Sequence, residues 1–79
     1  MTNIEKYNEL FIQNFRVRVE QLNSEFIASD IEQWDSLAHL QLITLLEDAF
    51  DILIDADEIM EITSYENGKI VLKKYGVEV

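Results

Sequence analysis

Trp34–Leu40 reads Trp-Asp-Ser-Leu-Ala-His-Leu, and it joins a long irregular segment to the longest apolar helical pattern in the chain. We expect Asp35 or Ser36 to cap that helix, because both side chains accept hydrogen bonds from the free backbone N–H groups of a first turn. A serine here is open to solvent, with the positive end of the helix dipole behind it. Such a position suits a phosphodiester, so Ser36 is the leading candidate for a functional residue.

The helix that begins at Ser36 is expected to run to about Phe50, because no Gly or Pro interrupts it. Projected at about 100° per residue, one face should lie in the core. Its members are His39, Leu42, Ile43, Leu46 and Phe50. Leu37, Leu40, Gln41, Thr44, Glu47 and Asp48 form an apolar and then acidic strip on the remaining surface. Leu37 and Leu40 are therefore candidates for contact with a partner.

A first helix and a long loop are expected before this segment. Thr2 or Asn3 can cap the first helix, whose apolar face is Ile4, Tyr7, Leu10, Phe11 and Phe15. Residues 17–33 lack any period and predict a loop. Its apolar residues, Leu22, Phe26, Ile27 and Ile31, should hold it against the helices, with Trp34 closing it over the core.

Two further helices are expected after Phe50. Asp55 or Asp57 starts a very short one through Met60, with Ile59 and Ile62 facing inward. Thr63 and Glu66 have capping-box spacing and predict a last helix to about Tyr75, ended by Gly76. Its apolar side is Ile70, Val71 and Leu72, and Gly68 within it costs about 1 kcal/mol relative to alanine.

These elements predict an all-α fold, a small antiparallel four-helix bundle formed by one domain over residues 1–79. A long loop separates its first two helices, and its third helix is short.

The amino-acid composition limits the classes of molecule that the protein can bind. The net charge is −10, the chain has no cysteine, and no Lys or Arg occurs from Val19 to Gly68. Such a surface repels nucleic acid and anionic membranes and attracts basic patches on other proteins, although acidity can also serve solubility alone. With no signal-like segment and no apolar run of membrane-spanning length, we expect a cytoplasmic, monomeric protein.

A longer pattern points to a family. Asp35-Ser36-Leu37 is followed, in order, by Leu42, Leu46, Glu47, Phe50, Asp51, Ile54, Ile59, Ile62 and Thr63. In these residues and their spacing the chain resembles the acyl carrier protein family. The resemblance implies that Ser36 attacks the pyrophosphate of coenzyme A in a separate phosphopantetheinyl transferase and receives a 4'-phosphopantetheine arm. It further implies the same four-helix bundle, whose groove between the second and third helices opens to hold an attached acyl chain.

Several of these acidic residues and the single histidine also allow other interpretations. Asp35 either helps to hold the transferase's divalent metal, as the resemblance implies, or only caps the helix. His39 has no residue to orient it as a base for Ser36, and a packed, hydrogen-bonded histidine is the simpler interpretation. Asp51, Asp55, Asp57 and Glu58 lack the spacing of a calcium loop, so weak charge relief by calcium or magnesium is the most they predict. We therefore assign neither a catalytic residue nor a metal site.

Three departures from the family bear on the pathway. Ala38 and Gln41 stand where carriers of general fatty acid synthesis commonly show acidic residues. Glu32-Gln33-Trp34 replaces a frequent Leu-Gly-Ala, and Asp55 replaces a common proline. These differences favour a carrier of a specialised pathway of the fatty acid or polyketide type, loaded with a short acyl, polyketide or aminoacyl group.

The resulting hypothesis is a discrete carrier protein, not an enzyme, that holds acyl intermediates as thioesters and delivers them to loading, elongating or transferring enzymes with basic docking patches. The docking candidates are Leu37, Leu40, Thr44, Glu47, Asp48, Met60 and Glu61. The alternatives are a peptidyl or aminoacyl carrier, an acidic helical interaction module with Ser36 unmodified, and a folding switch that responds to cations.

Overall fold

Four helices and no strand make up the protein. The computed structural model describes residues 1–79. Its helices are α1 (Asn3–Phe15), α2 (Ser36–Phe50), α3 (Ala56–Glu61) and α4 (Tyr65–Lys74). The loop between α1 and α2 contains two short 3-10 turns, Val19–Gln21 and Ala28–Asp30. The predicted all-α class, the long early loop and the short third helix are therefore confirmed.

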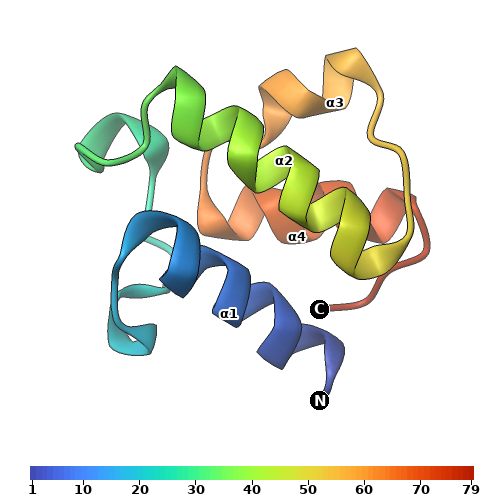
Figure 1. Cartoon of the computed structure of the whole chain (residues 1–79), viewed down its shortest axis with the longest axis horizontal. Helices are drawn as coiled ribbons and strands as arrows, with labels where there is room; N and C mark the ends of the chain where they lie inside the picture. The colour runs from blue at the N-terminus through green and yellow to red at the C-terminus, as the bar shows by residue number, and fades with distance from the viewer.

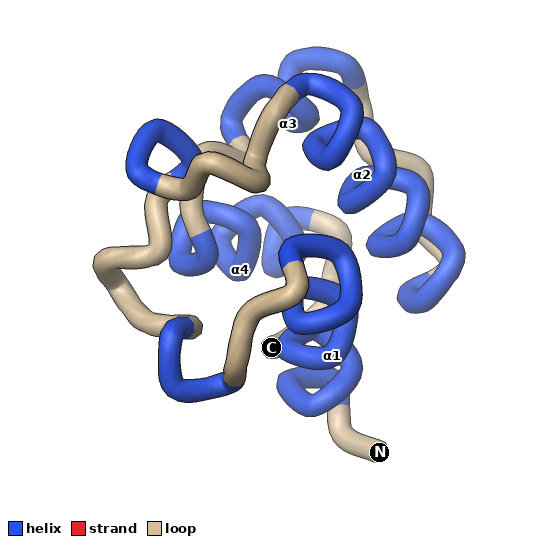
Figure 2. The backbone as a smooth tube through the Cα atoms, turned by 60° about the vertical axis from the view of Figure 1, so that its left-hand side comes forward, coloured by secondary structure: helices blue, strands red, loops and turns tan.

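α1 and α2 lie side by side and run in opposite directions, with α4 behind them (Figure 1). α3 lies at the top of this view and packs chiefly against α4. The turned view in Figure 2 shows the long loop on one side of α1 and α2 on the other. None of these helices combines the length and the apolar character that crossing a membrane requires.

The first two helices begin where the sequence predicted. Thr2 caps α1 with a reciprocal capping box, in which its hydroxyl accepts from the Glu5 N–H and the Glu5 carboxylate accepts from the Thr2 N–H. These bonds to Thr2 hold the pKa of Glu5 below its usual value. Asp35 caps α2 by accepting from the Ala38 N–H at 2.8 Å. Both caps satisfy donors that a helix leaves free.

The predicted cap of the last helix is wrong by one residue. Ser64, not Thr63, accepts from the Asn67 N–H at 3.0 Å and caps α4. The reason is an isolated antiparallel bridge between Ile27 and Ser64, in which the Thr63 carbonyl accepts from the Ala28 N–H. This bridge keeps the chain extended through Ser64, and it also fastens the long loop to the start of α4.

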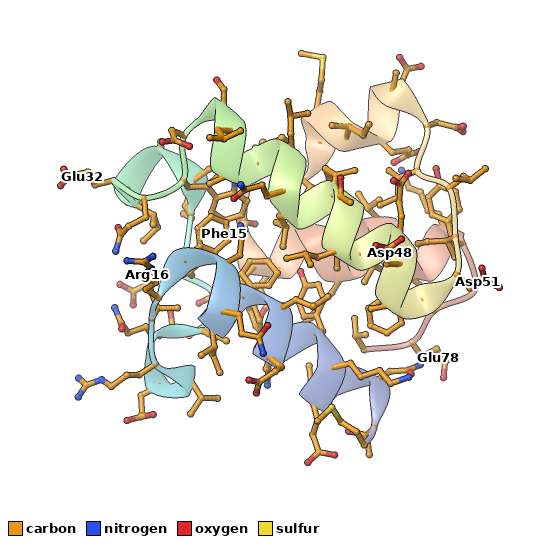
Figure 3. All side chains as sticks on the ribbon, in the orientation of Figure 1. Phe15, Arg16, Glu32, Asp48, Asp51 and Glu78 are labelled. Carbon is orange, nitrogen blue, oxygen red and sulfur yellow. The ribbon has the colours of Figure 1, made fainter.

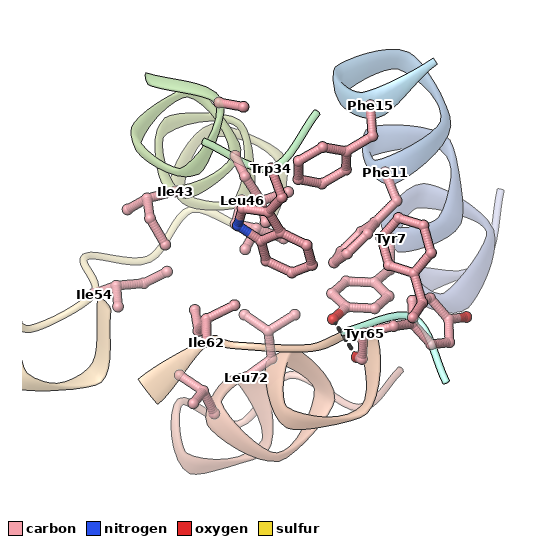
Figure 4. Packing of buried hydrophobic residues seen from close by; sticks show 14 of the residues in the cluster. Tyr7, Phe11, Phe15, Trp34, Ile43, Leu46, Ile54, Ile62, Tyr65 and Leu72 are labelled. Carbon is pink, nitrogen blue, oxygen red and sulfur yellow. Dashed lines mark hydrogen bonds between the residues drawn. The ribbon is translucent and has the colours of Figure 1, made fainter. Parts of the chain in front are cut away.

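The core is built around aromatic rings from α1. Tyr7, Phe11 and Phe15 are fully buried, and Figure 4 shows them facing Trp34 and Tyr65. On α2 the predicted core residues Leu42, Ile43 and Leu46 are buried, while His39 and Phe50 are partly buried. The predicted inward face of α4 is wrong at Ile70, which is 59% exposed. α4 starts at the buried Tyr65, so its inward positions recur at Gly68, Val71 and Leu72.

Gly68 leaves space for the side chain of Tyr7. A Cβ atom added at Gly68 would lie 2.1 Å from the Tyr7 hydroxyl oxygen and 3.2 Å from Tyr7 Cζ. The hydroxyl donates to the Tyr65 carbonyl at 2.7 Å, a bond drawn in Figure 4. Burial raises the pKa of Tyr7, so the phenol is a neutral donor in the folded protein. The glycine predicted to weaken the helix is therefore required for α1 to pack on α4.

We expect Gly68→Ala to destabilise the protein by about 1–3 kcal/mol through overpacking, although the same change in an open helix would stabilise it. Tyr7→Phe removes the oxygen that the new methyl group would strike, so the cost of Gly68→Ala should fall in that background. Urea unfolding of the four proteins in this double-mutant cycle measures the coupling. Equal effects of Gly68→Ala in both backgrounds would contradict the packing role.

Candidate functional site

Ser36 is the first residue of α2, and its side chain is exposed. The capping bond to this helix comes from Asp35, so the Ser36 hydroxyl is not used as a cap and makes no hydrogen bond within the protein. The N–H groups of the first turn and the positive end of the dipole of a 15-residue helix adjoin it. A negatively charged group attached to this oxygen would be stabilised there.

A groove opens beside Ser36, between the first half of α2 and the end of α3. Its volume is about 490 Å³, and it is lined mostly by apolar side chains. Its lining includes Trp34, Ser36, His39, Leu40, Ile59 and Met60. We call it the Ser36 groove. It brings together four of the residues predicted for the site, namely Asp35, Ser36, Leu40 and Met60.

Three groups in the Ser36 groove form a hydrogen-bonded chain. The Trp34 indole N–H donates to His39 Nδ1 at 3.0 Å, and His39 Nε2 lies 2.8 Å from the Ile59 carbonyl oxygen. Because the indole is only a donor, His39 Nδ1 must be the accepting nitrogen. His39 therefore carries its proton on Nε2 and donates it to Ile59. The prediction of a packed, hydrogen-bonded histidine is confirmed.

α3 is held mainly by side chains of other elements. It has no fully buried residue, and Asp55 makes no side-chain cap at its start. Lys74 of α4 lies 3.2 Å from Glu58 and 3.6 Å from Glu61, and the hydrogen bond to Glu58 is the main reason that the pKa of Lys74 is raised. The Tyr75 hydroxyl accepts from the Asp55 N–H at 2.9 Å. These contacts leave two of the three acidic side chains of α3, Glu58 and Glu61, paired with one lysine.

The exposed face of α2 beside Ser36 is apolar and then acidic, as the sequence predicted. Leu37 is 66% exposed and Leu40 is 58% exposed, and Met60 across the groove is 79% exposed. Thr44 and Asp48 are also exposed further along α2, and Figure 3 shows Asp48 near its C-terminal end. This set forms a continuous candidate docking surface from Ser36 to the end of the helix.

Two of the residues singled out from the sequence have structural roles. Glu47 is partly buried, and its carboxylate accepts from the Ile54 N–H at 3.0 Å, so it anchors the connector that follows α2. Ala38 is buried, and its carbonyl accepts from the Asn14 side chain of α1 at 2.9 Å. Position 38 therefore does not lie on the candidate docking surface.

The charges are segregated. All six basic residues lie in α1, just after it, or in α4: Lys6, Arg16, Arg18, Lys69, Lys73 and Lys74. The Ser36 groove and the outer face of α2 have none. No three His, Asp or Glu side chains are arranged to hold a metal ion. Asp51, considered above for loose cation binding, instead ends α2 in a left-handed backbone conformation.

The sequence did not reveal the partners of His39, Glu47 and Lys74. The one available signal was a lone histidine on an otherwise apolar face, which indicates a need for polar partners without identifying them. Comparisons with models of protein families, with curated proteins and with solved structures found no match. The geometry around Ser36 is therefore the basis for a functional proposal.

The role of Asp35 as the N-cap of α2 can be tested by measuring stability, without any assay of activity. We expect Asp35→Ala to lower the free energy of unfolding by about 1 kcal/mol, because the Ala38 N–H loses its acceptor. Asp35→Asn should be nearly neutral, since asparagine caps as well as aspartate. Urea unfolding measures both, with the exposed Asp30→Ala as a charge-matched control. An Asp35→Ala protein as stable as the wild type would show that Asp35 is dispensable as a cap.

Proposed function

We propose that this protein is an acyl carrier protein of cytoplasmic metabolism, modified at Ser36 with 4'-phosphopantetheine from coenzyme A. It would carry acyl intermediates as thioesters in a specialised pathway of the fatty acid or polyketide type and deliver them to partner enzymes. An aminoacyl or peptidyl carrier is the same proposal with a different cargo. The fold would then be a bundle of the acyl carrier type, consistent with four helices, a long first loop and a short third helix.

One observation carries this proposal: the Ser36 hydroxyl is exposed, unbonded and set at the start of α2 because Asp35 takes over the cap. A serine that served as an ordinary N-cap would have its oxygen occupied by a backbone N–H. Here the oxygen is free to attack phosphorus within a transferase. The resulting phosphodiester would carry its negative charge next to the helix N-terminus.

The residues around Ser36 fit the arm. The attachment oxygen faces solvent, and the adjoining groove of about 490 Å³ offers an apolar surface for a flexible chain to lie on. When attached, the arm would supply the thiol that this cysteine-free chain lacks. Asp35 keeps one carboxylate oxygen free of the cap, available to a metal ion held by the transferase.

The docking surface supports an acidic carrier that meets basic partners. Leu37, Leu40 and Met60 offer exposed apolar contacts beside Ser36, and Thr44, Asp48 and Glu61 extend the surface with polar and acidic groups. Charge complementarity of this kind mainly speeds encounter and weakens with salt. Glu47 contributes only to the edge of this surface, because its carboxylate accepts a hydrogen bond from the Ile54 N–H.

Modification of Ser36 is the deciding test. We expect the wild-type protein to gain the mass of one phosphopantetheine when incubated with coenzyme A, magnesium and a promiscuous phosphopantetheinyl transferase. Ser36→Ala should gain none. Ser29→Ala is the matched control, because Ser29 is exposed and also adjoins an aspartate, and this variant should be modified like the wild type. Intact-mass spectrometry measures all three proteins.

A folded wild-type protein that gains no mass with two different transferases would refute the carrier proposal. That result would favour the acidic interaction module, which needs the charged surface and leaves Ser36 unmodified. Circular dichroism of each sample excludes unfolding as the cause.

The docking surface makes a second prediction. Asp48 lies 12 residues beyond Ser36 on α2, about 18 Å along the helix axis. We expect Asp48→Lys to slow the initial rate of Ser36 modification about tenfold at low salt, and less at high salt. Glu25→Lys changes the net charge equally in the exposed long loop and should have a much smaller effect. Equal slowing by both variants would indicate that only total charge matters.

A further inference from the structure

We propose that the hydrogen-bonded series Trp34–His39–Ile59 closes the space between α2 and α3 beside Ser36, so that a short group attached at Ser36 stays outside in the Ser36 groove. His39 then sets how long an attached chain must be before it enters the helix bundle. That the attached chain is an acyl cargo rests on the proposed function, whereas the closed space is a property of the fold.

His39 spans the space between α2 and α3. It is the only residue whose side chain makes a hydrogen bond between these two helices, through Nε2 and the Ile59 carbonyl at 2.8 Å. α3 packs chiefly on α4 rather than on α2. The His39 side chain therefore bridges α2 and α3 at the wall of the Ser36 groove.

Trp34, at the other end of this series of hydrogen bonds, is fixed in the core. Trp34 is 8% exposed, and its ring packs against Phe15 with ring centroids 4.7 Å apart. Its indole N–H has His39 Nδ1 as its partner, and the His39 ring stacks against the indole. If His39 turned aside, this partly buried donor would lose its acceptor within the protein.

The residues beyond His39 leave little room. Ile62, which lines the Ser36 groove, is fully buried, and so are Leu42 and Leu46 of α2. An entering chain would have to separate these side chains as well as the His39 bonds. Burial of each methylene favours entry about fourfold, whereas loss of the two His39 hydrogen bonds opposes it by about fivefold to 150-fold. Groups of a few carbons gain too little from burial and remain in the groove.

The absence of cysteine allows a direct test that does not depend on any transferase. Ser36→Cys creates a single thiol, and ethyl, butyl and octyl methanethiosulfonate attach alkyl chains of increasing length to it. Methyl NMR signals report where each chain lies. Leu40 and Met60 line the groove, and Leu42 and Leu46 report on the core. The same series is recorded with His39→Ala, with Trp34→Phe and with Gln41→Ala, an exposed neighbour on α2, as the control.

With His39 present, we expect the ethyl and butyl chains to shift the Leu40 and Met60 methyl signals only. The octyl chain, which gains more from burial than the two His39 bonds cost, should also shift the Leu42 and Leu46 signals. With His39→Ala, the butyl chain should shift these core signals too. Trp34→Phe removes the indole donor while keeping an aromatic ring, and it should likewise allow the butyl chain to enter. This variant tests the proposal if His39→Ala proves to be unfolded, and Gln41→Ala should behave like its parent.

Core shifts from the butyl chain with His39 intact would overturn the proposal, as would a folded His39→Ala or Trp34→Phe protein in which the butyl chain still stays outside the core. Failure of the carrier proposal has a different signature, the lack of a phosphopantetheine mass on wild-type Ser36. Once the phosphopantetheine arm is attached, the same methyl signals can be recorded with a butanoyl or an octanoyl thioester on the arm. They test whether His39 limits the entry of natural acyl groups in the same way as it limits alkyl chains.

Discussion

The packing of the Phe11 ring is the interaction on which the arrangement of the helices and the long loop depends. The ring meets five other aromatic rings, with centroids 4.8 to 5.9 Å apart, in the tilted and edge-on geometries that aromatic pairs prefer. Those rings belong to Tyr7, Phe15, Phe26, Trp34 and Tyr65. They come from α1, from the long loop, from the residue before the α2 cap and from the start of α4. Because Trp34 is fixed in this cluster, the position of Ser36 two residues later is fixed as well.

Features set by local chemistry could be predicted from the sequence. The capping residues Thr2 and Asp35 act within one helical turn, and the core face of α2 follows from the helical period alone. The start of α4 could not be predicted in this way. Thr63 and Glu66 have suitable spacing, but the bridge between Ile27 and Ser64 joins residues far apart in the sequence and shifts the cap by one position. Ile70 is exposed because the buried face of α4 consists of Tyr65, Gly68, Val71 and Leu72, a face fixed by tertiary packing.

The same distinction applies to the candidate site. Ser36 is exposed because of its place at a helix start, which sequence alone indicates. The partners of Glu47 and His39 lie seven and twenty residues away in the sequence, and tertiary packing determines them. This explains why Glu47, predicted to be a docking residue, is also an anchor for Ile54. It also explains why His39 could be expected to pack and bond while its bridge to α3 could not.

The dependence of α3 on its neighbours links the fold to the handling of cargo. Six residues are too few for a stable helix in isolation, so α3 exists through its bonds to α2 and α4. The Lys74 pairs with Glu58 and Glu61 are exposed to solvent and contribute little by themselves. The His39 bond to Ile59 is more sheltered, and a bond of that kind contributes about 0.5–1.5 kcal/mol. A butanoyl-sized group that buried two or three methylenes would gain about 2 kcal/mol, roughly what breaking both His39 bonds would cost before the core is opened at all. The bond that secures α3 therefore also sets how large a group must be before entering the bundle becomes favourable.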